Sequence, residues 1–126
     1  MIPIKEDNIV IKIKGTPSQV ISNYLRIYLA NERLTEKQLE VTSKLVSKYS
    51  EYVANGVTEP YASILLFSTE TRKDVVTKLG ISAAHLNNTF NALTKKNILA
   101  KTDGKYSINP SLVPNRSLTF QFMIDG

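Results

Sequence analysis

The stretch of sequence that decides the fold is Ile81-Ser82-Ala83-Ala84-His85-Leu86-Asn87-Asn88-Thr89-Phe90-Asn91-Ala92-Leu93-Thr94-Lys95-Lys96. Ser82 is a favourable N-cap for a helix over about residues 83–97. Residues 69–79 predict a preceding helix, and Gly80 between the two readily takes the left-handed conformation that ends a helix. Two helices joined by a short glycine turn are typical of a helix-turn-helix.

A β-hairpin is predicted directly after these helices, over about residues 98–108. Asp103-Gly104 stands at its centre, between the runs Ile98 to Thr102 and Lys105 to Ile108. Asp-Gly favours a type I′ turn, because both central residues of that turn need a positive φ. A helix-turn-helix followed by a hairpin is the pattern of a winged helix, in which the hairpin is the wing.

This part of the chain resembles a known family. Residues 72–82, the helix to Lys96 and a wing ending in Tyr106-Ser107-Ile108-Asn109-Pro110 are similar to winged-helix DNA-binding proteins. The nearest in character are bacterial and phage transcription regulators and plasmid-type replication initiators. The resemblance covers a third of the chain, and it implies a recognition helix in the DNA major groove with the wing on the flanking backbone. Winged helices also dock proteins, so the fold alone does not determine the function.

The rest of the chain predicts a mainly helical α+β protein with an extra strand at each end. Residues 9–14 and 117–124 alternate in hydropathy, as half-buried strands do. These strands can pair within one chain or between chains. Thr16-Pro17 predicts the start of a helix that runs to about Ala30 and is apolar around most of its circumference. We expect that helix to be buried centrally or in a subunit interface.

Two further helices are predicted between these regions. Thr35 and Gln38 have the spacing of a capping box, so a helix should start there and end at Asn55-Gly56. Its core side is predicted to consist of Leu39, Val46, Tyr49 and Val53, with Leu45 and Tyr52 on the flank. A short apolar helix over residues 61–67 is interpreted as a connector that plugs the core. We therefore divide the chain into an N-terminal arm (1–33), a winged-helix domain (34–110) and a C-terminal strand arm (111–126).

The positive charge is concentrated in one part of the chain. The net charge is +5, from 16 basic and 11 acidic residues. Residues 1–71 hold eight of each sign, whereas residues 72–116 hold eight basic and two acidic residues. A basic module beside a neutral one fits an anionic partner such as nucleic acid. Small basic domains are also common, so charge alone leaves both alternatives open.

Composition also restricts the setting in which the protein works. There is no cysteine, which excludes disulfides and thiolate zinc sites and suits a reducing compartment. The N-terminus has no signal-peptide pattern, and the longest apolar run, residues 64–67, is too short for a membrane span. We expect a cytoplasmic protein without a membrane partner. The many Lys, Asn and Ile residues suggest an AT-rich genome, as in many phages, so the location would be a host cytoplasm or a virion.

The candidate recognition surface is the outward face of the helix over residues 83–97. By helical phase that face carries Ala84, Asn87, Asn88, Asn91 and Lys95, opposite a core side of Leu86, Phe90, Leu93 and Asn97. An asparagine amide can bond adenine N6 and N7 together, and an alanine can contact a thymine methyl group. The alternative is a solvated face in a protein that has ten asparagines.

Further candidates are residues that could contact phosphate. His85 lies at the edge of the outward face, and Arg72, Lys73, Lys101 and Lys105 lie near the start of the preceding helix or beside the wing turn. Phosphate contacts provide affinity and orientation without reading sequence. Each of these cations is as readily explained as an uninvolved surface charge.

No motif indicates catalysis. The sequence has no phosphate-binding loop, dinucleotide fingerprint, serine elbow or zinc-protease motif, and we expect neither an enzyme nor a cofactor or metal. The first hypothesis is a sequence-specific binder of double-stranded DNA, a dimeric or larger transcriptional or replication regulator. The alternative is a non-enzymatic phage structural or assembly protein that uses the winged helix and terminal strands for protein docking or DNA packaging.

Overall fold

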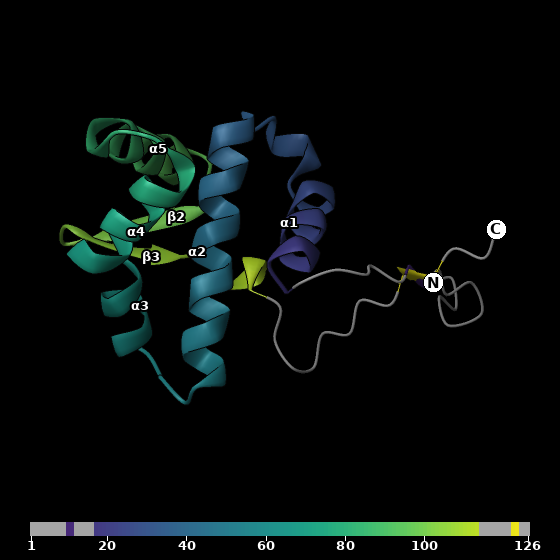
Figure 1. The fold of residues 1–126 in the computed structure, drawn as a ribbon, viewed down its shortest axis with the longest axis horizontal. Helices are drawn as coiled ribbons and strands as arrows, with labels where there is room; N and C mark the ends of the chain where they lie inside the picture. Colours follow the sequence, from purple (N-terminus) through teal and green to yellow (C-terminus); the bar gives the residue numbers. More distant parts are fainter. Residues whose placement is uncertain (1–9, 12–16, 114–121, 124–126) are drawn as a thin grey trace.

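The computed structural model describes residues 10–11, 17–113 and 122–123. These residues form a mainly helical α+β structure (Figure 1). Its helices are α1 (Pro17–Tyr28), α2 (Glu36–Ala54), α3 (Tyr61–Leu66), α4 (Thr69–Leu79) and α5 (Ala83–Lys95). Its strands are β1 (Val10–Ile11), β2 (Leu99–Thr102), β3 (Lys105–Ile108) and β4 (Phe122–Met123), and its 3₁₀ turns are η2 (Ala30–Glu32) and η3 (Pro110–Leu112).

Helix α2 is the central element of the fold. It has α1 on one side and α3, α4, α5 and the β2–β3 hairpin on the other (Figure 1). The predicted capping box is confirmed, because the Gln38 amide donates to Thr35 Oγ1 at 3.1 Å and the Thr35 amide donates to Gln38 Oε1 at 3.0 Å. The helix also ends before Asn55, as expected. The prediction for Val53 is wrong: it is 47% exposed, because it lies in the last turn, beyond the buried segment of α2.

One continuous hydrophobic core joins all the helices and the hairpin. From α1 it takes Tyr24 and Leu25, and from α2 mainly Val41, Leu45 and Val46. Leu66, Val75, Phe90, Leu93 and Ile108 add side chains from the elements that follow, and each is at most 5% exposed. Helix α1 buries only one face, since Ile27 and Tyr28 remain about half exposed.

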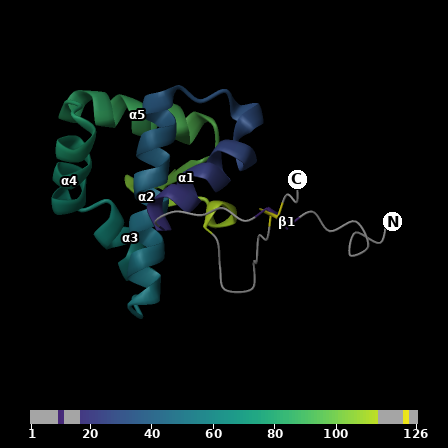
Figure 2. The ribbon, with the colours of Figure 1, turned by 45° about the vertical axis from the view of Figure 1, so that its right-hand side comes forward.

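The connection between α4 and α5 follows the local rules read from the sequence. Ser68 Oγ accepts from the Thr71 amide at the start of α4, and Ser82 Oγ accepts from the His85 amide at 3.0 Å at the start of α5. Gly80 is left-handed, with φ 64° and ψ 38°, and ends α4. Helix α5 then lies across the end of α4 (Figure 2).

The end of α5 differs from the prediction. The helix stops at Lys95, two residues before the expected end at 97. Asn97 has a left-handed φ of 60° and is exposed, so it does not share the core side of the helix. This conformation reverses the chain, so that the amide of Ile98 bonds Leu93 O at 3.0 Å and β2 can begin.

The hairpin is formed as predicted. Asp103 and Gly104 have φ values of 52° and 75°, which fits the expected two-residue turn. The strands pair in the register Thr102 with Lys105 and Lys101 with Tyr106.

The short helix α3 packs against the core with only part of its surface. Ala62 and Leu66 are fully buried, whereas Tyr61, Ile64 and Leu65 are 65%, 55% and 42% exposed. The expected apolar connector therefore has an outward apolar face, which was not predicted.

The two terminal strands pair with each other. Val10 lies opposite Met123 and Ile11 opposite Phe122 in an antiparallel ladder. The remaining parts of the predicted strands, 9–14 and 117–124, lie outside the described residues, as does the predicted N-cap Thr16. Among the described helices, none has the length and apolar character needed to cross a bilayer.

Candidate nucleic-acid interface

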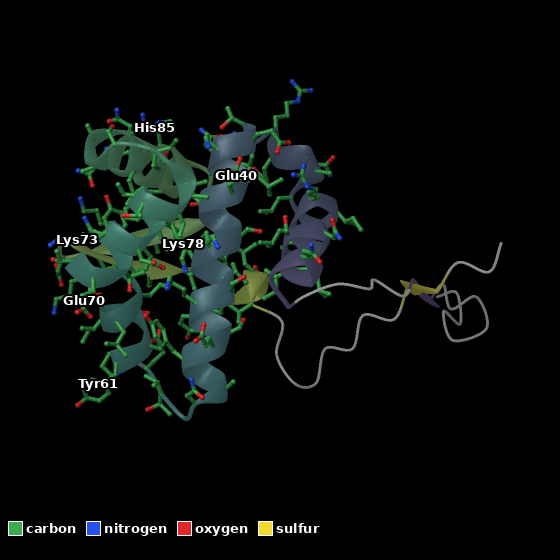
Figure 3. The ribbon with its side chains drawn as sticks, viewed as in Figure 1. Glu40, Tyr61, Glu70, Lys73, Lys78 and His85 are labelled. Atoms are coloured by element: carbon green, nitrogen blue, oxygen red, sulfur yellow. The ribbon has the colours of Figure 1, made fainter. Side chains whose placement is uncertain are left out.

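The outward face of α5 has the composition that its helical phase predicted. Ala84, Asn87, Asn88, Asn91 and Lys95 are all exposed, and so is His85 near the start of the helix (Figure 3). On the opposite side, Leu86, Phe90 and Leu93 are buried. Thr89, which was not predicted there, is also buried, and its hydroxyl donates to His85 O at 2.9 Å. One side of helix α5 is thus packed in the core, and its polar side chains lie outside the core.

The three asparagines on this face are not equivalent. Within residues 19–113, the side chains of Asn87 and Asn88 make no hydrogen bond. Asn91 is different, because its Oδ1 accepts from the hydroxyl of Tyr106 at 3.3 Å. The structure thereby links the outward face of α5 to strand β3 of the hairpin.

Tyr106 belongs to an aromatic cluster between α3, α4, α5 and the hairpin. The Tyr106 ring centroid lies 5.5 Å from that of Phe67 and 5.3 Å from that of Phe90. Phe67 and Phe90 meet edge to face at 5.5 Å. We call Phe67, Phe90 and Tyr106, together with Arg72, the Tyr106 cluster.

Arg72 lies inside this cluster and not on the open surface. Its guanidinium carbon is 5.3 Å from the Phe90 centroid and 5.9 Å from the Tyr106 centroid, distances at which a cation is attracted to ring faces. Its Nε donates to Phe67 O at 3.1 Å. The sequence suggested a phosphate contact, but in the structure Arg72 is half-buried and holds the hairpin against α4 and α5.

The other predicted cations remain at the surface. Lys73, Lys95, Lys101 and Lys105 are exposed, and none forms an ion pair with another described residue. Lys73 projects from α4 (Figure 3), while Lys95 is on α5 and Lys105 is next to the turn. Lys101 lies opposite Tyr106 in the hairpin, with its Nζ 5.0 Å from the ring centroid. These four lysines, on α4, α5 and the hairpin, keep unneutralised charge at the surface.

Several nearby cations instead stabilise the fold. Lys78 and Lys48 both contact Asp74 Oδ2, at 3.4 Å and 2.8 Å. The bond to Lys48 lowers the pKa of Asp74, and the same bond raises the pKa of Lys48. Lys96 donates from Nζ to Glu32 O at 2.7 Å.

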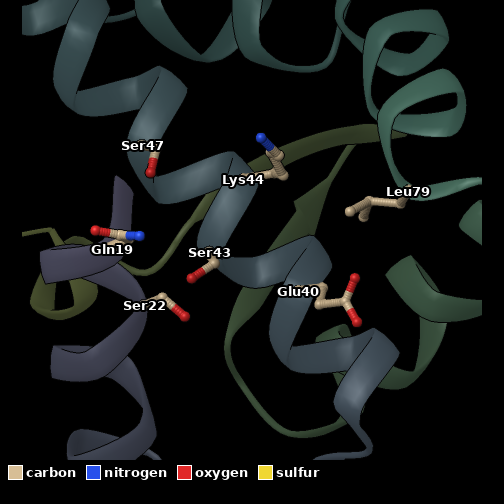
Figure 4. Close-up of a pocket in the computed structure, with 7 residues that line it drawn as sticks. All are labelled: Gln19, Ser22, Glu40, Ser43, Lys44, Ser47 and Leu79. Atoms are coloured by element: carbon tan, nitrogen blue, oxygen red, sulfur yellow. The ribbon is translucent and has the colours of Figure 1, made fainter. Parts of the chain in front are cut away.

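Two hollows are lined by residues outside α5. One, of about 250 Å³, is lined by Gln19, Ser22, Glu40, Ser43, Lys44, Ser47 and Leu79 (Figure 4). The other, of about 690 Å³, runs between α3 and the hairpin and has Phe67, Arg72 and Tyr106 in its wall. No group of His, Cys, Asp or Glu among the described residues could hold a metal ion.

Tyr106 was not predicted as a residue of the site, although the sequence indicates its contact with Lys101. A two-residue turn at Asp103-Gly104 places Lys101 opposite Tyr106, and cross-strand neighbours are in contact. Its contacts with Phe67 and Arg72 depend on the tertiary fold and have no local signal.

No family model, no curated protein and no solved structure matches this chain.

Proposed function

We propose that the chain is a sequence-specific binder of double-stranded DNA. In this proposal α4, the Gly80 turn, α5 and the β2–β3 hairpin are a winged helix-turn-helix. Helix α5 enters the major groove, and the hairpin lies on the flanking backbone. The observation that supports this most is the outward face of α5, where Asn87 and Asn88 carry amides that bond no other described residue and Lys95 is exposed and unpaired within the described part of the chain.

The two kinds of side chain have different tasks in this proposal. Asn87 and Asn88 read base edges, because a carboxamide both donates and accepts hydrogen bonds and matches adenine N6 and N7. Lysines contact phosphate and release bound counterions, so they provide affinity for any sequence. Four surface lysines (Lys73, Lys95, Lys101 and Lys105) correspond to a slope of log affinity against log salt of about −3.6.

The wider proposal is a dimeric or larger, non-enzymatic regulator of transcription or replication, of the kind found in bacteria and phages. Operators recognised by paired helices bind two copies of α5 in successive major grooves. Ile27 and Tyr28, the exposed apolar residues of α1, are available for such an assembly.

Site selection from random duplexes, followed by fluorescence anisotropy over a range of salt, tests this function. Asn88→Ala should cost about 1–3 kcal/mol on the selected sequence only and leave the salt slope unchanged. Lys95→Ala should weaken binding to all sequences equally and reduce the slope by about one ion. Asn23→Ala on the exposed side of α1 and Lys44→Ala on α2 are matched controls and should change neither. Equal losses on all sequences from both classes would mean non-specific binding, and no loss from either would remove DNA as the partner.

A second candidate function is protein docking in an assembly, such as a phage particle. The outward apolar face of α3 supports it, since Tyr61, Ile64 and Leu65 lie within four residues of one another and are all substantially exposed. Tyr61 projects away from the body of the molecule (Figure 3). Stable oligomers without affinity for DNA at low salt would favour this function over the first.

A further inference from the structure

The position of the Tyr106 hydroxyl is fixed by the packing of its ring. Phe67 and Phe90 lie 5.5 Å and 5.3 Å away, centroid to centroid. The cations of Arg72 and Lys101 lie 5.9 Å and 5.0 Å from the same ring. The ring is therefore packed by residues from the C-terminal end of α3 and from α4, α5 and β2, and its hydroxyl lies beside Asn91.

The bond from Tyr106 is made to the oxygen end of the Asn91 amide, so that this end faces the hairpin. A carboxamide that makes no other contact can turn over and present its oxygen or its nitrogen with little difference in energy. In Asn91 the oxygen accepts from Tyr106 at 3.3 Å, so the nitrogen, which carries two donors and no acceptor, points away from the phenol. Asn87 and Asn88 make no such bond and can present either end.

We propose that Tyr106 is a positioning residue that holds Asn91 as a hydrogen-bond donor, so that Asn91 reads a base through an acceptor atom such as purine N7 or guanine O6. The adenine amino group, which needs an acceptor, is then read by Asn87 or Asn88 and not by Asn91. This inference rests on the proposed DNA binding and assigns different base chemistry to neighbouring asparagines.

Tyr106→Phe is the decisive variant because it removes the hydroxyl and keeps the ring that packs in the cluster. Tyr52→Phe is the matched control: it also removes one hydroxyl, which pairs with Thr71 Oγ1 at 3.2 Å between α2 and α4. A general effect of losing a tyrosine hydroxyl on stability would appear in both variants. An effect on Asn91 should appear only in Tyr106→Phe.

The first measurement needs no DNA. In the ¹⁵N-correlated NMR spectrum of the free protein, Tyr106→Phe should shift the side-chain amide signals of Asn91 and leave those of Asn87 in place. Tyr52→Phe should leave both in place. If the Asn91 signals are the same in the parent and in Tyr106→Phe, the phenol does not hold the amide and the inference is overturned.

The second measurement locates the base. Asn91→Ala identifies the position in the selected site at which base preference is lost. At that position, replacing a purine by its 7-deaza analogue should weaken parent binding, whereas removing an adenine amino group should not. Tyr106→Phe should reduce the preference there about 3- to 10-fold, without changing the salt slope, and should add nothing to Asn91→Ala.

The outcomes separate the two proposals. If the parent binds no duplex, the proposed function fails and this inference fails with it. If the parent binds specifically but Tyr106→Phe and Tyr52→Phe have equal base preferences, only the inference fails. Dependence on the adenine amino group at the Asn91 position would also overturn it, because Asn91 would then be acting as an acceptor.

Discussion

Gly104→Val tests whether the hairpin turn has the geometry on which the proposed wing depends. Gly104 has a φ of 75°, a conformation that L-residues rarely adopt and β-branched residues adopt least. A Cβ added at this position meets no atom within 4 Å. The cost of the substitution is therefore conformational strain in the turn and not a steric clash.

The destabilisation expected for Gly104→Val is therefore the cost of backbone strain alone. Placing an L-residue in the left-handed region costs about 1–2 kcal/mol. This free energy corresponds to a roughly 5- to 30-fold increase in the equilibrium constant for opening the hairpin. Gly104→Asn is the matched control, since asparagine tolerates this region better than valine and should produce a much smaller change.

Amide hydrogen exchange and DNA binding should be measured on the same variants. We expect Gly104→Val to speed exchange in β2 and β3 and to weaken binding, with the helical circular dichroism retained. Unchanged exchange in β2 and β3 would refute the left-handed turn. Faster exchange with parental binding would show that the hairpin takes no part in contacting DNA.

Three further changes test other parts of the structure. Phe90→Ala should lower the free energy of unfolding in urea by about 3–5 kcal/mol, because Phe90 is 1% exposed in the core; a loss below 1 kcal/mol would contradict that packing. The bond from Lys48 lowers the pKa of Asp74, so its stabilisation is present at neutral pH and is lost as the pH falls below about 4. Asp74→Asn should flatten the acid side of a plot of stability against pH, and an unchanged plot would show that the ion pair contributes nothing. Ile64→Ser should reduce any self-association seen by light scattering with little loss of stability, since Ile64 is 55% exposed; unchanged association would exclude the α3 face as the interface.

Local signals in the sequence predicted the local structure well. The capping box at Thr35, the turn at Gly80 and the turn at Asp103-Gly104 all have the expected geometry. Each depends on the conformational preferences or hydrogen bonds of residues close together in the chain. The exposed face of α5 was also predictable, because helical phase alone decides which side chains share a side.

Features that depend on tertiary packing were not predictable in the same way. Val53 continues the apolar spacing of α2, but the last turn of that helix extends past the residues it packs against. Arg72 was expected at the surface, but its neighbours Phe90 and Tyr106 are brought to it only by the complete fold. Asn97 has the spacing of the core side of α5, but its left-handed conformation lies beyond the end of that helix and allows β2 to start.

The same packing changes how the positive charge of this region should be understood. Seven basic residues lie between positions 72 and 105, which on sequence alone indicates a strongly basic face. Arg72 stacks on aromatic rings, Lys78 pairs with Asp74, and Lys96 bonds Glu32 O. Side chains engaged in these contacts are less free to reach a phosphate. A proposed interface with four available lysines gains less affinity from phosphate than the sequence suggests, so in this proposal a larger share of the affinity for the preferred site comes from base contacts of Asn87, Asn88 and Asn91 on α5.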